Sequence, residues 1–224
     1  MIPGHVHYIG RERQPVIEID DFVPDPQAFI DEAASLSYST IGVHYPGVRV
    51  ELQPARLQTF MPGIVTQILQ VFGCGAKLQL LEAYYSVVTT RPESLTPIQR
   101  LPHFDGLERE RIALLHFLST DGPSGTAFYR HRSTGFESVD AARYPIFSKA
   151  LEHDVAVHGL PEPGYINGDT PIHEQIARFE GQFNRALIYR GHALHCALLP
   201  EDLSFSPDPR RGRLTVNTFL MAAA

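Results

Sequence analysis

The sequence is poor in the residues that mark a secreted or membrane-bound protein. It contains two cysteines, Cys74 and Cys196, and no tryptophan in 224 residues. Two cysteines so far apart do not form the disulfide framework of a small secreted domain, so we expect a reducing, cytoplasmic location. No apolar run approaches the roughly 20 residues of a membrane-spanning helix, and the N-terminus lacks the charged and then apolar pattern of a signal peptide. We therefore expect no membrane partner.

Positive charge is also scarce. The chain has 19 lysines and arginines against 25 acidic residues, which gives a formal net charge of −6. The basic residues are scattered except for a short run at 210–213, so we expect no nucleic acid partner. Hydrophobic residues make up 43% and charged residues 20% of the chain, values typical of a folded globular protein. The length fits a single domain over residues 1–224.

The first third of the chain carries signals for helices. Val16–Ile19 has the composition of a short strand, but Asp25 followed by Pro26 is a typical helix start, and apolar residues follow at helical spacing. A second helix should follow Pro62 and end at Gly73. These signals predict a helical N-terminal flank over residues 1–76.

From residue 77 the pattern changes to short strands separated by turns. Strands are expected at 78–88, 99–105, 112–118, 126–132, 174–179, 185–189, 195–199 and 213–220. Residues 138–168 interrupt this series with helical spacing and several prolines and glycines, so they look inserted. The pattern predicts a mainly β (α+β) fold, a β-sandwich or jelly roll over residues 77–220, with flanking helices and a helical insertion.

The segment Leu101–Asp105 holds the first candidate functional residues. Side chains alternate faces in an extended segment, so His103 and Asp105 should project the same way. A distant histidine would complete a set of two histidines and one carboxylate, which leaves the opposite side of a metal open, as in non-haem Fe(II) oxygenases. Both residues also have ordinary uses, because His103 could lie on the surface and Asp105 could form a turn before Gly106.

Two late histidines could supply the third ligand. His195 begins the apolar run Cys196–Leu199 and should therefore enter a strand, whereas His192 follows Gly191 in a sequence typical of a turn. We favour His195 and keep His192 as the alternative.

The last expected strand carries a candidate anion-binding residue. Arg213, Thr215 and Asn217 are two residues apart and share one face. A planar guanidinium can grip a carboxylate through two parallel hydrogen bonds, which a lysine cannot reproduce. An exposed Arg213 could instead pair with Asp208.

The order of these motifs resembles the Fe(II)/2-oxoglutarate-dependent dioxygenase superfamily, and within it the prolyl-4-hydroxylase-like branch. The motifs that carry the resemblance are Gln99–Asp105, Gly125–Phe128, His195 and Arg213–Thr215. The similarity covers about residues 78–220 and is nearest to a bacterial subfamily known mainly from genome sequences. It implies a double-stranded β-helix core of the jelly-roll, cupin-like type.

The resemblance also implies an enzyme that couples conversion of 2-oxoglutarate and dioxygen into succinate and carbon dioxide to hydroxylation of a substrate. The implied ligands of Fe(II) are His103, Asp105 and His195. The implied contacts of 2-oxoglutarate are Arg213, which would bind its distal carboxylate, with Thr215 and Tyr85 as further candidates. Related halogenases lack the carboxylate ligand, so Asp105 favours hydroxylation or desaturation. The loop 200–212 makes the spacing from His195 to Arg213 longer than is usual in the superfamily. His192 therefore remains an alternative third ligand.

Substrate contacts are marked only by polar residues beside the expected core strands. The candidates are Tyr45, Arg49, Tyr129, His131 and Asn217. We expect a small-molecule or peptidyl substrate and dioxygen as partners, and the sequence gives no sign of oligomeric state.

Two other functions fit the same residues. A cupin-like metalloenzyme would not need 2-oxoglutarate or Arg213, and a non-catalytic β-sandwich binding module would not need His103 and Asp105.

Overall fold

Two antiparallel sheets form the body of the computed structural model, which describes residues 4–73, 75–119, 124–200 and 202–223. The larger sheet has the order β1 (His5–Ile9), β2 (Gln14–Ile19), β8 (Ala186–Arg190), β5 (Arg111–Phe117), β10 (Arg213–Ala223), β4 (Lys77–Val88), β3 (Gly47–Glu51). The smaller sheet has the order β7 (His173–Gly181), β6 (Ser124–His131), β9 (His195–Leu198).

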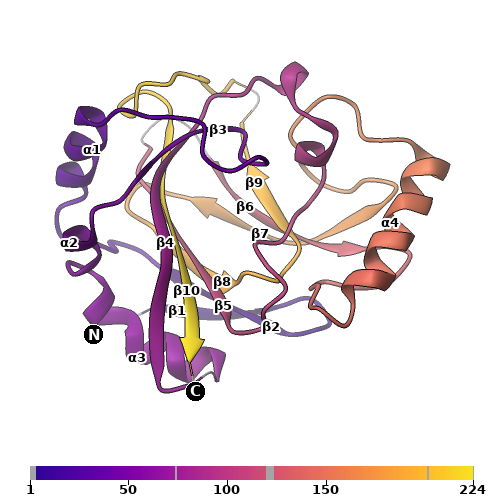
Figure 1. Ribbon diagram of the computed structural model, residues 1–224, viewed down its shortest axis with the longest axis horizontal. Coiled ribbons are helices and arrows are strands. Elements are labelled where there is room, and N and C mark those ends of the chain that lie inside the picture. The colour runs from indigo at the N-terminus through magenta and orange to yellow at the C-terminus, as the bar shows by residue number, and fades with distance from the viewer. Residues whose placement is uncertain (1–3, 74, 120–123, 201, 224) are drawn as a thin grey trace.

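From β4 onward the chain winds back and forth between the two sheets (Figure 1). β4 and β5 lie in the larger sheet, β6 and β7 in the smaller one, and β8, β9 and β10 alternate between them. Apolar side chains from both sheets fill the space between them, including Phe117, Phe128, Phe179 and Leu187. Facing antiparallel sheets wound in this way form a double-stranded β-helix, so the expected mainly β fold is confirmed.

Helices cover the outer face of the larger sheet. They are α1 (Pro26–Ser35), the short α2 (Pro54–Leu57) and α3 (Met61–Phe72). α1 begins as the sequence predicts, because the Asp25 carboxylate accepts a hydrogen bond of 3.1 Å from the backbone N–H of Ala28. α3 ends at Gly73, whose φ of 59° is the left-handed conformation that glycine adopts without strain.

The packing of these helices decides which residues of the sheet face the interior. Ile64 and Ile68 of α3 belong to one buried cluster with Leu214 and Val216 of β10. Burial of one such side chain contributes about 1.5–3 kcal/mol. Because side chains alternate along a strand, Arg213 and the residues two and four positions after it face the space between the sheets.

The N-terminal 76 residues are only partly helical, in contrast to the prediction. β1, β2 and β3 lie in this region and extend the larger sheet at both edges. Only Val16–Ile19, now within β2, carried a strand signal. β1 is only five residues long and lies at the edge of the sheet, and β3 begins inside the expected Pro46-Gly47 turn.

Two further segments frame the site. Residues 99–105 were predicted as a strand, but η2 (Pro97–Arg100) is a 3-10 helix, and beyond it only His103 pairs as an isolated β-bridge. η1 (Pro92–Ser94) is another such turn. The predicted helical insertion is confirmed as α4 (Tyr144–His158), where Pro145 lies in the first turn and its missing N–H breaks no helical bond. Figure 1 shows α4 on the side of the molecule opposite α1.

In the part of the chain that the structure describes, no helix is long and apolar enough to cross a bilayer. Cys196 is a free thiol, and Cys74 lies outside the described residues.

Candidate active site

Backbone hydrogen bonds bring His103, Asp105 and His195 together. The N–H of each histidine donates to the carbonyl oxygen of the other at 2.8 Å, and the two rings have centroids 4.4 Å apart. The N–H of Asp105 donates to the Gly191 carbonyl at 2.7 Å. The segment before β5 is therefore tied to the segment that leads into β9, which fixes the positions of all three side chains.

The ligand atoms of these three residues, which we call the triad, converge. One nitrogen of each histidine and one carboxylate oxygen lie within 4.8 Å of one another. Nε2 of His103 is 3.9 Å from Oδ1 of Asp105, and Nε2 of His195 is 3.6 Å from Oδ2. Nδ1 of His195 lies 2.9 Å from the Ala193 carbonyl oxygen and donates to it, which leaves the Nε2 lone pair for a metal. Among the described residues, no other group of His, Cys, Asp or Glu meets this criterion.

The electrostatics of the triad fit a bound cation. Oδ2 of Asp105 is buried and has no hydrogen-bond partner among the described residues. Burial raises the pKa of Asp105, while His195 and two arginines lower it. The surrounding protein and the neighbouring His195 lower the pKa of His103, and the neutral form of its imidazole is the one that can coordinate a metal. A divalent ion would supply the partner that the carboxylate lacks.

Arg213 lies on the inner face of β10 and is buried, with 3% of its surface exposed. Its Nη2 donates to the Gly125 carbonyl at 3.2 Å, while its Nε is buried without a hydrogen-bond partner. Its guanidinium carbon is 5.6 Å from the ring centroid of Phe117. The described residues place no carboxylate within ion-pair distance, so the alternative pairing with Asp208 is not formed. A buried cation with an open donor is suited to a carboxylate ligand.

Thr215 and Asn217 also face the interior. Thr215 lies opposite Ser86 of β4 and Phe117 of β5, and its hydroxyl donates to Oδ1 of Asn217 at 2.7 Å. These two side chains therefore continue the face that begins with Arg213, as their spacing predicted.

Tyr85 does not lie on this inner face beside Arg213, in contrast to the expectation. It pairs with Val216, is fully buried in the cluster formed with the flanking helices, and has Glu32 and Arg56 as its charged neighbours. Tyr84 and Ser86 occupy the inner face instead. The sequence could not decide between neighbouring positions, because the second half of β4 is buried on both faces and shows no alternation.

Tyr129 and His131 also lie away from the pocket, on the outer face of the smaller sheet beneath α4. Tyr129 packs in a buried cluster with Phe147 of α4. His131 has Nδ1 2.9 Å from the Thr134 hydroxyl and Nε2 3.1 Å from a carboxylate oxygen of Asp154. The polarity that marked them for substrate binding belongs to a buried contact between sheet and helix.

Tyr45 and Arg49 do lie by the pocket. The guanidinium carbon of Arg49 is 3.8 Å from the ring centroid of Tyr45. Burial raises the pKa of Tyr45, and the charges of Arg213 and Arg49 act in the opposite direction, so both cations are close to its hydroxyl.

Two tyrosines of the pocket were not identified from the sequence. The ring of Tyr189 on β8 is 4.8 Å from the ring of His195, and the charges of Asp105 and Arg213 both influence its pKa, which burial raises. Tyr189 is therefore close to the triad and within electrostatic range of Arg213. Tyr165, from the insertion, donates to the Thr90 carbonyl at 2.8 Å and is also close to Arg213. Tyr189 could have been found from its place on an expected strand, but no local signal marks Tyr165.

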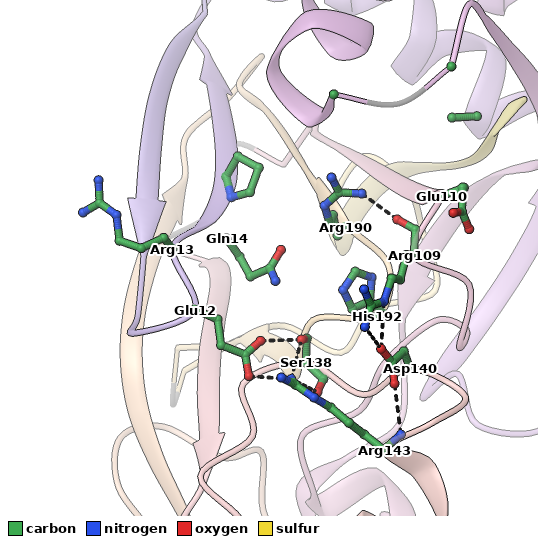
Figure 2. A pocket seen from close by; sticks show the side chains of 14 residues that line it. Glu12, Arg13, Gln14, Arg109, Glu110, Ser138, Asp140, Arg143, Arg190 and His192 are labelled. Atoms are coloured by element: carbon green, nitrogen blue, oxygen red, sulfur yellow. Dashed lines mark hydrogen bonds and ion pairs between the residues drawn. The ribbon is translucent and has the colours of Figure 1, made fainter. Parts of the chain in front are cut away.

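His192, the alternative third ligand, lies in a different cavity (Figure 2). This cavity has a volume of about 840 Å³ and is lined by charged residues that are paired with one another, including Arg143 with Glu12 at 2.6 Å and Arg109 with Asp140. Burial lowers the pKa of His192 to about 4. The group of converging ligand atoms contains His195 and not His192.

Comparisons with known proteins agree with this fold. The family model described as "Family of unknown function (DUF6445)" matches residues 2–220. No curated protein matches the chain. The solved structure of HygX from Streptomyces hygroscopicus, with nickel and 2-oxoglutarate bound, is similar with a TM-score of 0.53 at 12% identity, over 95% of this chain and 84% of HygX. SnoK, a non-heme alpha ketoglutarate dependent carbocyclase from nogalamycin biosynthesis, has a TM-score of 0.52 at 12% identity, over 95% of this chain and 81% of SnoK. At such identities the likeness concerns the fold.

Proposed function

We propose that this chain, which belongs to the DUF6445 family, is an Fe(II)- and 2-oxoglutarate-dependent dioxygenase that hydroxylates a substrate. One observation carries the proposal. The triad of His103, Asp105 and His195 and the buried, unpaired Arg213 lie on the inside of the same double-stranded β-helix, with Tyr189 close to both. A triad or a buried arginine alone would fit several kinds of protein. Together they would provide a metal site and a carboxylate site on the inside of one double-stranded β-helix.

The triad residues fit Fe(II). Two neutral imidazoles and one carboxylate are the donor set of non-haem iron sites with open positions. His195 is oriented by its hydrogen bond to the Ala193 carbonyl, and the buried Oδ2 of Asp105 lacks any other partner among the described residues. HygX has been crystallised with nickel and 2-oxoglutarate and, separately, with iron, which supports the same assignment for this fold.

Arg213 fits the distal carboxylate of 2-oxoglutarate. Its Nε and the remaining donors of its guanidinium can form two parallel bonds to one carboxylate, and its burial strengthens them. Thr215 lies beside it on the same strand, and Tyr45, Tyr165 and Tyr189 surround it. Iron and 2-oxoglutarate, when bound, would supply the oxidation. 2-Oxoglutarate would lose carbon dioxide and take up one oxygen atom of dioxygen to become succinate, and the other oxygen atom would enter the substrate.

Aromatic side chains lie between the sheets near these residues. Phe117 and Phe128 are fully buried there, and the ring centroid of Tyr189 is 4.8 Å from that of His195. Such a lining would limit the access of water to the reacting groups, which keeps a reactive site from oxidising water or its own side chains.

Finer assignments stay predictions. We place the enzyme in the prolyl-4-hydroxylase-like branch on the order of its motifs, and in the cytoplasm on its few cysteines. Dioxygen and a small-molecule or peptidyl substrate are its expected partners, and neither nucleic acid nor membrane is among them.

Anaerobic absorption spectroscopy tests the proposal. Addition of Fe(II) and then 2-oxoglutarate to purified protein should give a visible charge-transfer band, because 2-oxoglutarate chelates the iron. The band should be absent in Asp105→Ala, and Arg213→Gln should need about 10- to 100-fold more 2-oxoglutarate to reach the same intensity, the effect of losing a buried charged hydrogen-bond pair worth about 1.5–3 kcal/mol.

Arg210→Gln is the matched control, because Arg210 is exposed, lies three residues from Arg213 and pairs with Asp31 at the surface. It should behave as the wild type. A protein that binds Fe(II) but gives no band with 2-oxoglutarate would indicate the cupin-like alternative. A protein that binds neither would indicate a β-sandwich without this chemistry.

A further inference from the structure

A second arginine, Arg49, lies on the same inner face as Arg213. It is on β3, and the strand register places it opposite Ser86 of β4, which in turn lies opposite Thr215 of β10. The N–H of Arg49 donates to the Ser39 carbonyl at 2.8 Å, and the Arg49 carbonyl accepts the Ser39 N–H at 3.0 Å, so both of its backbone groups are bonded to Ser39. These bonds and the pairing of β3 with β4 fix the main chain at Arg49, although β3 is at the edge of the sheet.

The guanidinium of Arg49 is held by aromatic rings. It stacks on Tyr45 at 3.8 Å and lies 5.4 Å from the ring centroid of Tyr84, distances at which a cation is attracted to the ring face. Its Nε is buried and has no hydrogen-bond partner, and no carboxylate of the described residues lies within 4 Å of it. The nearby Glu82 carboxylate accepts the Tyr84 hydroxyl at 2.8 Å instead.

Arg49 is also close to the triad. Its charge lowers the pKa of both His103 and Asp105, and the pKa of Arg49 is itself lowered by burial. The loop that carries His44 and Tyr45 joins β3 at this point and is tied to η2 by a hydrogen bond of 3.2 Å from Gln99. Arg49 is therefore within electrostatic range of two triad residues, one of which, His103, has 52% of its side chain exposed.

The two arginines need two anions, and the co-substrate supplies only one of them. 2-Oxoglutarate has two carboxylates, of which one chelates the metal and the other binds Arg213. Arg49 is only partly buried, but its Nε is shielded from solvent and has no hydrogen-bond partner among the described residues, so its guanidinium is available to an anion from another molecule. Arg213 is the more deeply buried and is surrounded by three tyrosines, while the partly buried Arg49 is the more accessible of the two to a substrate.

We propose that Arg49 is a substrate-binding residue and that the substrate is an organic acid, one carboxylate of which pairs with this guanidinium beside the metal. The inference rests on the proposed function, because it assigns Arg213 to the co-substrate. It narrows the substrate to acids and predicts that the corresponding neutral amides do not bind.

Anaerobic calorimetry on the protein loaded with Fe(II) and saturating 2-oxoglutarate tests the inference. The probes are a panel of carboxylates, namely acetate, propionate, benzoate, N-acetylglycine and N-acetylalanine, each compared with its primary amide. At least one acid should bind with a Kd at least tenfold lower than that of its amide. Arg49→Gln should weaken that binding at least tenfold and Arg49→Lys less, while both keep the wild-type affinity for 2-oxoglutarate within threefold. Arg132→Gln, which removes an exposed arginine paired with Asp169, is the control and should leave acid binding unchanged.

Three results would overturn the inference. They are failure of every acid of the panel to bind, equal binding of acids and amides, and loss of 2-oxoglutarate affinity in Arg49→Gln comparable to the loss in Arg213→Gln. The last result would assign Arg49 to the co-substrate or to support of the triad. Failure of the wild type to bind 2-oxoglutarate in the loading step would instead refute the proposed function.

Discussion

Within the described part of the chain, two histidines and an aspartate meet both between the sheets and beneath α4, and of these two places only the first has the geometry of a metal site. The triad lies between the sheets. The other place, which we call the helix-side cluster, consists of His131, His173 and Asp154 and lies between the smaller sheet and α4. Both combine two histidines with one carboxylate, so residue type alone does not distinguish them.

The two places differ in how their ring nitrogens and carboxylate oxygens are arranged. In the helix-side cluster both rings are fully buried, Nδ1 of His131 is bonded to Thr134, and the carboxylate of Asp154 accepts the Ser133 hydroxyl and is 3.1 Å from Nε2 of His131. Neither ring nitrogen of His173 has a hydrogen-bond partner among the described residues, but the cluster does not form a group of converging ligand atoms. In the triad the ligand atoms converge, Oδ2 of Asp105 has no hydrogen-bond partner among the described residues, and 52% of the His103 side chain is exposed.

The largest expected effect separates the two aspartates. Asp105→Ala should abolish iron binding and lower turnover by at least about 1000-fold, because it removes a ligand and leaves two neutral imidazoles. Asp154→Ala should keep one iron per chain but lower the free energy of unfolding by about 2 kcal/mol, since it removes the carboxylate that lies 3.1 Å from Nε2 of the buried His131 ring. Iron stoichiometry and urea denaturation measure the two effects. Loss of iron from the Asp154 variant with the fold intact would mean that the two clusters have been assigned the wrong way round.

The two late histidines should also behave differently. His195→Ala removes a converging nitrogen and should lower iron affinity at least about 100-fold, whereas His192→Ala changes only the wall of the separate cavity in Figure 2 and should leave iron affinity unchanged. Competition of the two variants against a chelator of known affinity gives the comparison. Retained iron in His195→Ala would reopen the choice of the third ligand.

Arg213→Gln should raise the KM for 2-oxoglutarate by about 10- to 100-fold and leave iron affinity within threefold of the wild type, because the guanidinium holds the far end of the co-substrate and not the metal. Initial-rate measurements at varied 2-oxoglutarate, beside Arg210→Gln, provide the check. An unchanged KM would remove Arg213 from the co-substrate site.

Buried histidines, one of them in the helix-side cluster, should make the fold sensitive to acid. Burial lowers the pKa of His173 to about 3, and that of His116, which is hydrogen-bonded to Asn184 at 3.0 Å, to about 4. Between about pH 4 and pH 6.5 the unfolded chain binds protons that the folded chain does not, so the free energy of unfolding should fall as the pH falls, by up to about 1.4 kcal/mol per pH unit for each histidine. Above pH 6.5 these histidines contribute no pH dependence.

Replacement of His173 by Leu tests this effect, because leucine fills the buried site and has no titrating group. The variant should show a shallower decline in stability between pH 6.5 and pH 4 in urea titrations of the apoprotein. A decline as steep as in the wild type would place the acid sensitivity elsewhere.

The sequence predicted most of the fold because its signals were local. The capped start of α1 at Asp25, the glycine end of α3 and the strands from residue 77 onward, except the one predicted at 99–105, agree with the structure. The irregular segment before β5 could not be predicted, since its pairing depends on a distant partner, as in the bridge between His103 and His195. β1 pairs with the neighbouring β2 and was missed although its partner is local.

The candidate site was predictable in part for the same reason. The two-residue spacing of Arg213, Thr215 and Asn217 predicted that they share one face, because side chains alternate regularly along a strand. It could not place Tyr85, which lies in a stretch buried on both faces, nor recognise that α4 covers Tyr129 and His131. No sequence signal could locate Tyr165, which reaches the pocket from a loop of the insertion.

A crystal structure of the protein grown anaerobically with Fe(II) and 2-oxoglutarate, with anomalous diffraction recorded at the iron edge, would show both proposed sites at once. We expect one strong anomalous peak bonded to His103, Asp105 and His195, with the distal carboxylate of 2-oxoglutarate on Arg213. A peak in the cavity around His192 or at the helix-side cluster, or 2-oxoglutarate bound away from Arg213, would contradict the proposed function.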